Sequence, residues 1–180
     1  LSAADLKALL NRFFTPMTRI IFDRRGTIDK YVGDSVMAFW GAPLRQADYA
    51  ERGCRAALAM AEALCADNAR RARKGRPPVR LRIGLHSGPV IVGNIGAPGR
   101  INYTLVGDTV NVASRIEAVT RELGAVGAIS SQVAEAVINE ATGEETRLLA
   151  GFTNQGQIAL KGRAEKVTVL TYGAVPAGPI

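Results

Sequence analysis

Two residues on one predicted helix face have the types and the spacing to act on a phosphorylated compound. Asn111 and Arg115 stand four residues apart, so on a helix their side chains share a face and can converge on one ligand. The guanidinium of Arg115 can donate to phosphate oxygens, and the amide of Asn111 can stabilise a developing charge. Taken alone, this spacing is more typical of a solvated helix face.

A carboxylate and three cations are further candidates. Asp34 follows Gly33 between two apolar runs, where an ordinary turn residue is the simpler interpretation. Lys30, Arg82 and Lys161 can each bind anionic oxygens, and each is also explained as a solvated surface residue. The chain contains neither a GxxxxGK[ST] loop nor a GxGxxG motif, so kinase-like and dinucleotide-binding functions lack their signature.

Hydrophobic periodicity predicts the elements that must position these residues. Apolar residues recur every three or four positions from Leu6 to Ile21, which predicts an amphipathic helix with Pro16 as a kink or break. Alternating runs at 27–31 and 35–40 predict a hairpin. Further helices are expected at 48–73, 109–123 and 132–140, and further strands at 79–85, 90–93, 103–106, 128–129, 157–161 and 167–172.

Hairpins mixed with helices predict an α+β fold with a largely antiparallel sheet and helices on one face. A turn at 87–89 predicts that the strands at 79–85 and 90–93 pair with each other. Asp48 followed by Glu51 predicts a capping box, and Asp108 is expected to cap another helix.

Composition indicates one globular domain spanning residues 1–180. The chain is 47% hydrophobic and 22% charged, which is enough apolar material for a core. The first residues do not predict a signal peptide, and no apolar run reaches the roughly 18 residues that a transmembrane helix needs. Seven basic residues lie between Arg70 and Arg82, which leaves 16 basic and 16 acidic residues elsewhere. That segment is typical of a solvated helix end and loop, so no nucleic-acid partner is expected; contact with RNA or phospholipid is the alternative.

Cysteine and histidine content excludes several chemistries. Cys54 and Cys65 lie on one predicted helix, about 16 Å apart along its axis, whereas a disulfide requires Cα atoms within about 7 Å. The single histidine, His86, cannot form a two-histidine zinc site, and no CxxC pair is present. A serine–histidine nucleophile is disfavoured because His86 and Ser87 are adjacent on a predicted strand and point to opposite faces.

Three segments together resemble the catalytic domain of class III nucleotide cyclases. They read TIDKYVGDSVMAFWG at 27–41, RIGLHSG at 82–88 followed by GNIG at 93–96, and YTLVGDTVNVASR at 103–115. Their order and spacing match this family over nearly the whole chain, down to LKG at 160–162. Agreement of all these motifs in register is hard to explain by chance.

The resemblance implies a fold and a reaction. Members of the family are α+β domains with a ferredoxin-like core that pair head to tail, here as a homodimer, with active sites at the interface. The 3′-hydroxyl of a nucleoside triphosphate attacks its own α-phosphate and gives the cyclic nucleotide and pyrophosphate. Two metal ions per site, Mg²⁺ or Mn²⁺, are held by two aspartates, and Asp34 matches one of them. An oxygen-only site suits these hard ions.

By the same resemblance, Asn111 and Arg115 match the pair that orients the ribose and stabilises the transition state from the partner chain. Arg82 and Lys161 match phosphate-binding positions, which suits their cationic side chains.

Lys30 and Thr104 match the two base-recognition positions of this family. A lysine only donates, which suits N1 of adenine, and a threonine hydroxyl can accept from the amino group of adenine. Guanine reverses both groups, so Lys30 would oppose its N1–H. The resemblance therefore implies an adenylate cyclase of bacterial type that uses ATP, with guanylate cyclase as the disfavoured alternative.

One departure from the family concerns the other metal aspartate, which members carry upstream in a segment like FxDIxGF. The sequence begins at Leu1 within the loop that follows that strand, and Asp5 stands in a different context. We expect that the strand is missing from this sequence; a degenerate domain that binds nucleotide or a partner without catalysis is the alternative. The resemblance also implies a fused sensor or membrane domain upstream, with this domain in the cytoplasm.

Overall fold

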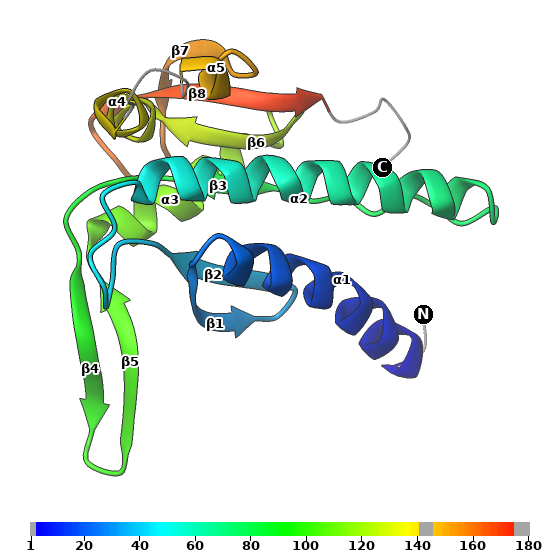
Figure 1. The fold of residues 1–180 in the computed structure, drawn as a ribbon, viewed down its shortest axis with the longest axis horizontal. Helices are drawn as coiled ribbons and strands as arrows, with labels where there is room; N and C mark the ends of the chain where they lie inside the picture. Colours follow the sequence, from blue (N-terminus) through cyan, green and yellow to red (C-terminus); the bar gives the residue numbers. More distant parts are fainter. Residues whose placement is uncertain (1–2, 141–145, 175–180) are drawn as a thin grey trace.

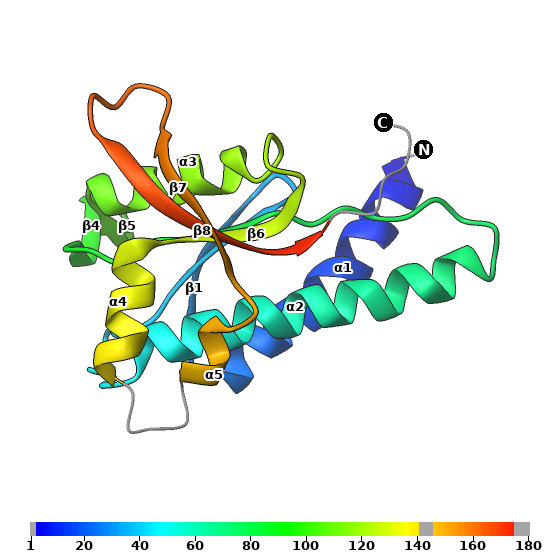
Figure 2. The same ribbon diagram turned by 90° about the horizontal axis from the view of Figure 1, so that it is seen from above.

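The computed structural model describes residues 3–140 and 146–174 as a mixed arrangement of helices and strands (Figures 1 and 2). Its helices are α1 (Ala3–Asp23), α2 (Tyr49–Ala72), α3 (Asp108–Val119), α4 (Ser131–Glu140) and α5 (Thr146–Leu149). Its strands are β1 (Thr27–Val32), β2 (Ser35–Phe39), β3 (Ile83–Leu85), β4 (Ile91–Ala97), β5 (Arg100–Val106), β6 (Ala125–Ser130), β7 (Thr153–Ala159) and β8 (Lys166–Ala174). Across these two ranges, no helix combines the length and the apolar character needed to cross a membrane.

The strands form a four-stranded sheet and two separate hairpins. The sheet has the order β3–β6–β8–β7 and is antiparallel except for the parallel pair β3–β6. The predicted α+β class is confirmed, but the predicted pairing of 79–85 with 90–93 is wrong, because β4 pairs with β5 instead. The segment before Ile83 is not a strand. At its start, the side chain of Asn68 on α2 binds the backbone N–H and C=O of Val79, which are then not available to a neighbouring strand.

Helices cover both faces of the four-stranded sheet, not one face as predicted. Ala128 of β6 packs with Val112 of α3, whereas the next residue, Ile129, packs with Cys54 of α2 and with residues of α4. Neighbouring residues of a strand point to opposite faces, so α3 lies on one face and α2 with α4 on the other (Figure 2). Cys54 is buried, Cys65 is exposed, and both thiols are free, as the sequence predicts.

The β1–β2 hairpin packs against the first two helices. Met17 and Ile21 of α1 are buried in a cluster with Met60 of α2, and Ile28 of β1 packs against that cluster. Pro16 does not end α1, which continues to Asp23 as one helix. Burial of the apolar face immediately after the proline offsets the backbone hydrogen bond that proline cannot make.

The capping box predicted at the start of α2 is wrong. Asp48 makes no cap bond and pairs instead with Arg52, one turn along the helix, at 2.7 Å. The backbone N–H groups of Ala50 and Glu51 donate to the two carboxylate oxygens of Glu140, at the end of α4. A distant carboxylate therefore caps α2 and ties it to α4.

Candidate functional site

A cavity of about 320 Å³ is lined by β1 and by the β4–β5 hairpin. The residues around it are Asp29, Lys30, Ile95, Asn102, Tyr103 and Thr104. The structure therefore brings Lys30 and Thr104, expected to recognise the base, to one cavity from two strands that are distant in the sequence. Half of the Lys30 side chain is exposed, at 50%, whereas Thr104 is buried, at 9%. The cavity offers an ammonium donor and a hydroxyl to its occupant.

A β-bulge in β1 determines which side chains line this cavity. Ile28 pairs with Ala38 and Lys30 pairs with Met37, so Asp29 is the extra residue of β1. Neighbouring strand residues normally point to opposite faces, and a bulge re-aims one of them. Asp29 and Lys30 accordingly both line the cavity, and the Lys30 ammonium lies 3.2 Å from Oδ2 of Asp29.

Buried oxygen atoms that have no hydrogen-bond partner in the described part of the chain border the same cavity. They are both carboxylate oxygens of Asp29, whose side chain is 1% exposed, and Oγ1 of Thr104. Buried polar atoms in proteins usually have partners, so unsatisfied ones beside a cavity indicate a place for a polar ligand. The sequence motifs alone do not mark Asp29 as a site residue. The available signal was a carboxylate directly beside Lys30 inside an apolar strand.

The second group of expected site residues gathers on α3 and on the loop after β7. Asn111 is exposed and Arg115 is half-buried. A Cβ atom at Gly162 would lie 3.6 Å from Nη2 of Arg115, so the guanidinium lies against the loop that carries Lys161. Leu160 is buried in the core cluster of α3 and anchors this loop. An amide and two cations therefore share one surface, which we call the α3 cluster.

An ion pair fastens the same loop to the start of α3. Arg163 binds Asp108. The prediction that Asp108 caps α3 is wrong, because Asp108 is the first residue of the helix and Gly107 holds the cap position. His86 lies near this pair and hydrogen-bonds through Nδ1 to the hydroxyl of Ser130 at 2.8 Å. Burial lowers the pKa of His86, and the charge of Arg163 lowers it further, against an opposing effect of Asp108. The folded protein therefore favours the neutral imidazole.

The depth of α3 on the sheet depends on a glycine in β3. A Cβ atom at Gly84 would overlap the backbone of Ala113 and Glu117. Only glycine permits so close an approach of a helix to a strand. These two helix residues flank Arg115, so Gly84 sets the position from which α3 presents its guanidinium.

The other two expected site residues, Asp34 and Arg82, stand apart from both groups. Asp34 is exposed in the turn between β1 and β2, after Gly33, whose φ of 60° is a left-handed conformation that glycine adopts readily. Arg82 is exposed directly before β3. In the part of the chain that the structure describes, no hydrogen bond or ion pair joins either residue to Lys30 or Arg115.

Two aspartates are expected to bind the metal ions, and Asp34 is the one that this sequence contains. Within residues 3–140 and 146–174, no group of three or more His, Cys, Asp or Glu side chains could hold a metal ion. Mg²⁺, however, is commonly held by one or two carboxylates together with water and substrate phosphates. An exposed carboxylate at a hairpin tip fits such a partial ligand set.

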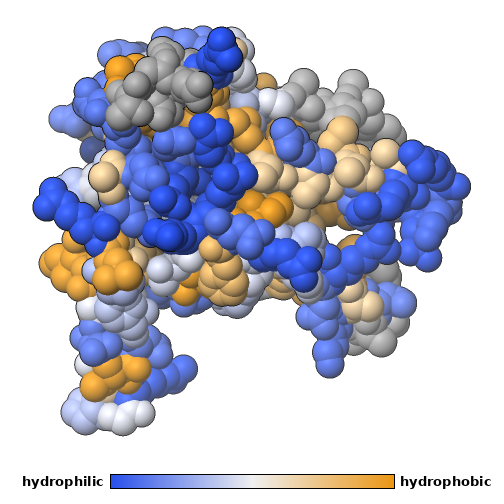
Figure 3. All heavy atoms as spheres, viewed as in Figure 1, coloured by the Kyte–Doolittle hydropathy of each residue, from blue (hydrophilic) through white to orange (hydrophobic). Residues whose placement is uncertain are grey.

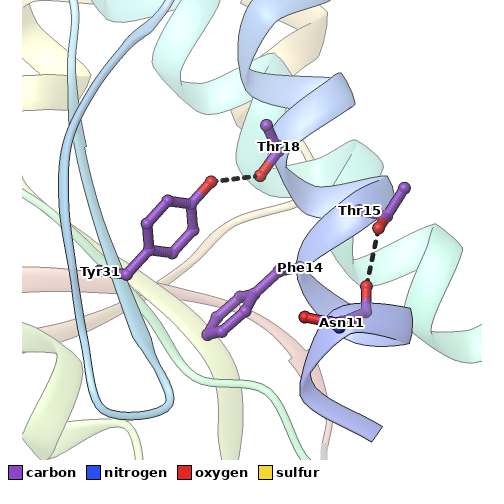
Figure 4. A pocket seen from close by; sticks show the side chains of 5 residues that line it. All are labelled: Asn11, Phe14, Thr15, Thr18 and Tyr31. Carbon is purple, nitrogen blue, oxygen red and sulfur yellow. Dashed lines mark hydrogen bonds between the residues drawn. The ribbon is translucent and has the colours of Figure 1, made fainter. Parts of the chain in front are cut away.

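A larger, open cavity of about 450 Å³ lies between α1 and β1 (Figure 4). The hydroxyls of Thr18 and Tyr31 bind each other at 2.8 Å, and the hydroxyl of Thr15 donates to the backbone of Asn11. The ring of Phe14 meets Tyr31 edge-on. None of the described residues that line this cavity is charged, and these hydroxyls already have partners, so it lacks the features of a phosphate or base site.

The β4–β5 hairpin projects from the rest of the chain as an arm (Figure 1). Apolar atoms appear on it at its base and near its tip (Figure 3). Its exposed large apolar side chains are Ile91, Ile95, Ile101, Tyr103 and Val106. Exposed apolar surface of this kind on a projecting element is typical of contact with a partner.

Comparison with known proteins places this geometry in a family. The family model described as the adenylate and guanylate cyclase catalytic domain matches residues 1–173. Adenylate cyclase 1 of Rhizobium meliloti (strain 1021) is 40% identical over 140 residues, which are 76% of this chain and 21% of that protein. The chain thus spans about a fifth of that relative.

Solved structures of the family superpose on the described fold. The adenylyl cyclase CyaB from P. aeruginosa aligns with a TM-score of 0.79 at 30% identity, covering 95% of this chain and 83% of that one. The guanylyl cyclase Cya2 aligns with a TM-score of 0.77 at 30% identity, covering 97% and 83%. The chain therefore belongs to the adenylate and guanylate cyclase catalytic-domain family, a metal-dependent class III family.

Proposed function

We propose that this chain is the catalytic domain of an adenylate cyclase, which converts ATP to 3′,5′-cyclic AMP and pyrophosphate. The observation that carries the proposal is the cavity that Lys30 and Thr104 share. Adenine presents an acceptor at N1 and a donor at its amino group, which complement an ammonium and a hydroxyl oxygen. Guanine presents the reverse pattern, and sites built on hydrogen bonds discriminate strongly against such a mismatch.

The α3 cluster suits the other end of the same substrate. In the reaction, the 3′-hydroxyl oxygen forms a bond to the α-phosphorus while the bond to the pyrophosphate oxygen breaks. Negative charge grows on the phosphate oxygens, and the guanidinium of Arg115 can stabilise it. We assign Asn111 to the ribose, and Lys161 and Arg82 to the phosphates.

Divalent metal ions, two Mg²⁺ or Mn²⁺ per site, are part of the proposal. Asp34 fits as one ligand because it is exposed and has no ion-pair partner among the described residues. When bound, such ions make the 3′-hydroxyl easier to deprotonate and neutralise triphosphate charge. The contribution of the chain at this point is to hold a carboxylate on a short, fixed turn.

Direct measurement of product tests the function. With Mg²⁺ or Mn²⁺ and equal ATP or GTP, we expect cyclic AMP at a rate at least about 100-fold above that of cyclic GMP. Comparable rates would overturn the assignment of the base. Binding of ATP without any cyclic product would favour a domain that binds nucleotide without catalysis.

The proposed active unit is a head-to-tail homodimer. The exposed apolar side chains of the projecting β4–β5 arm support contact with a partner chain. Among the described residues, no hydrogen bond or ion pair joins Asp34 or Arg82 to the α3 cluster within one chain. In such a dimer, each site combines Asp34 of one chain with Arg115 of the other.

Mixing of two inactive variants tests this arrangement. Asp34→Ala and Arg115→Ala should each abolish activity in a homodimer, because every site then carries the lesion. In a heterodimer, one site collects both lesions and the other collects neither. Random pairing of exchanging subunits should restore roughly one quarter of the original activity if the sites are independent. No recovery, with exchange shown directly, would contradict shared sites.

The domain is also proposed to work as one part of a longer protein. The coverage of about a fifth of the Rhizobium enzyme supports a fused regulatory or membrane domain. We also propose that the catalytic domain lies on the cytoplasmic side, where its proposed substrate, ATP, is available.

A further inference from the structure

The buried carboxylate of Asp29 has no role in the function proposed so far. Its side chain is 1% exposed, and neither oxygen has a hydrogen-bond partner among the residues that the structure describes. Burying a carboxylate with unfilled acceptor positions is unfavourable, so Asp29 lowers the stability of the fold. A residue with this cost is expected to have a functional role. The ammonium of Lys30 lies 3.2 Å from Oδ2 of this carboxylate.

The bulge in β1 makes this contact possible. Without the extra residue, Asp29 and Lys30 would point to opposite faces of the hairpin. With it, both line the cavity of about 320 Å³ that also contains Thr104. A bulge is a specific way to re-aim one side chain beside a site. The local backbone therefore serves to place a carboxylate behind a lysine.

We propose that Asp29 is a positioning residue for Lys30, which fixes the direction in which the ammonium donates into the cavity. The inference rests on the proposed function, because it takes Lys30 as the residue that reads the base. Lys30 is far more accessible from the cavity than Asp29, with 50% of its side chain exposed against 1%, so we assign to Asp29 an effect exerted through Lys30.

The physical gain is preorganisation. A lysine has three N–H donors on a flexible four-carbon stem. The ion pair with Asp29 restricts the positions that the ammonium occupies, so less freedom is lost when a base binds. A donor held in a fixed direction also discriminates better than a mobile one between adenine, whose N1 is an acceptor, and guanine, whose N1–H is a donor.

Asp29→Asn is the first test, because it removes the charge and keeps the shape. We expect the KM for ATP to rise about tenfold, with kcat changed less than about threefold, and the preference for ATP over GTP to fall. Titration with 3′-deoxy-ATP, which cannot cyclise, should show the same loss of affinity. Asp67→Asn is the matched control, because Asp67 pairs with Arg12 and Arg70 outside the cavity. This variant should leave the KM for ATP and the affinity for 3′-deoxy-ATP unchanged.

A double-mutant cycle separates positioning from a general structural role. In the Lys30→Ala background, Asp29→Asn should change KM and 3′-deoxy-ATP affinity by less than about twofold, because the residue that it positions is gone. A full tenfold effect in that background would overturn the proposal. An unchanged KM in Asp29→Asn, with an active wild-type protein, would overturn it as well.

Thermal unfolding supplies a readout that needs no activity. Lys30→Ala leaves a buried carboxylate without its counter-charge and should lower Tm by about 5 °C or more. In the Asp29→Asn background, the same change should lower Tm by less than about 2 °C. If the Tm changes of the two substitutions are additive, the pairing of Asp29 with Lys30 is refuted, whether or not the protein is a cyclase. If the Tm changes are coupled but no cyclic AMP is made, the proposed function is refuted and the pairing of Asp29 with Lys30 is still supported.

Discussion

The cavity at β1 and the α3 cluster both present basic side chains, but they hold them in different ways. In the cavity, Lys30 is paired with the buried carboxylate of Asp29, and Thr104 is buried beside them. On α3, Asn111 is exposed, and Arg115 has no ion-pair partner among the described residues. One region fixes its cation with a counter-charge, and the other leaves its cation uncompensated.

The difference suggests a division of labour. A neutral base is recognised by the direction of hydrogen bonds, so a cation that reads it gains from being held in place. A triphosphate is recognised by its charge, and negative charge grows on it in the transition state. A cation without a counter-charge can stabilise that growing charge more strongly than a paired one. Changes in the cavity should therefore alter nucleotide preference and KM, and changes on α3 should alter kcat.

The largest effect is expected on α3. Arg115→Ala should lower kcat about 10²–10³-fold with little change in KM, because the guanidinium is assigned to charge that grows in the transition state. Steady-state kinetics check this, with Arg121→Ala, an exposed position after α3, as the control. Tm should stay nearly constant, since such a surface change is usually within about 0.5 kcal/mol. An unchanged kcat would return Arg115 to an ordinary surface role.

A smaller effect is expected in the cavity. Lys30→Glu should lower kcat/KM for ATP about 10–100-fold, mainly through KM, because a charge-assisted donor becomes an acceptor that opposes N1 of adenine. Lys7→Glu, an equal change of charge on the exposed face of α1, should have no effect. Full activity of Lys30→Glu would remove this lysine from the site.

A substitution in β3, beneath α3, is a third test of whether the α3 cluster and the cavity at β1 have different roles. Gly84→Ala should reduce the free energy of unfolding by about 1–3 kcal/mol and Tm by about 2–4 °C for each kcal/mol, because the added methyl group displaces α3. At temperatures where the variant stays folded, kcat should fall more than the affinity for 3′-deoxy-ATP. Gly151→Ala, where a Cβ atom meets nothing within 4 Å, is the control. Equal stability of both variants would contradict the close approach of α3.

The smallest effect concerns acid pH. Because the pKa of His86 is lowered in the folded protein, the unfolded chain, with a pKa near 6.5, binds the proton more readily. The stabilisation from a neutral imidazole is therefore present above about pH 6.5 and is lost as the pH falls below it. Denaturant unfolding at pH 7 and pH 5 should show this loss, and His86→Gln should reduce it. An identical pH dependence in the variant would assign the loss to other groups.

Local sequence patterns predicted the elements well and their partners poorly. The hairpin at 27–40 and the helix at 48–73 follow from periodicity and turn residues, and the structure confirms them. The pairing of β3 with β6 depends on contacts between segments that no local pattern relates. The cap of α2 by Glu140 and the approach of α3 to Gly84 are equally non-local.

The candidate site divides along the same line. Family motifs selected Lys30, Thr104, Asn111 and Arg115, and the structure places the first two at one cavity and the other two on one helix. Asp29 was not selected, because its importance depends on burial and on a bulge. Alternation along a regular strand would have placed it on the opposite face from Lys30.

The ratio of kcat/KM for ATP to that for GTP, measured on Lys30→Glu and Arg115→Lys beside the wild-type protein, tests the division of labour most directly. We expect the ratio to fall at least about tenfold in Lys30→Glu and to stay within about threefold of wild type in Arg115→Lys, although Arg115→Lys loses kcat for both nucleotides. A ratio that is unchanged in Lys30→Glu, or that falls equally in both variants, would contradict it.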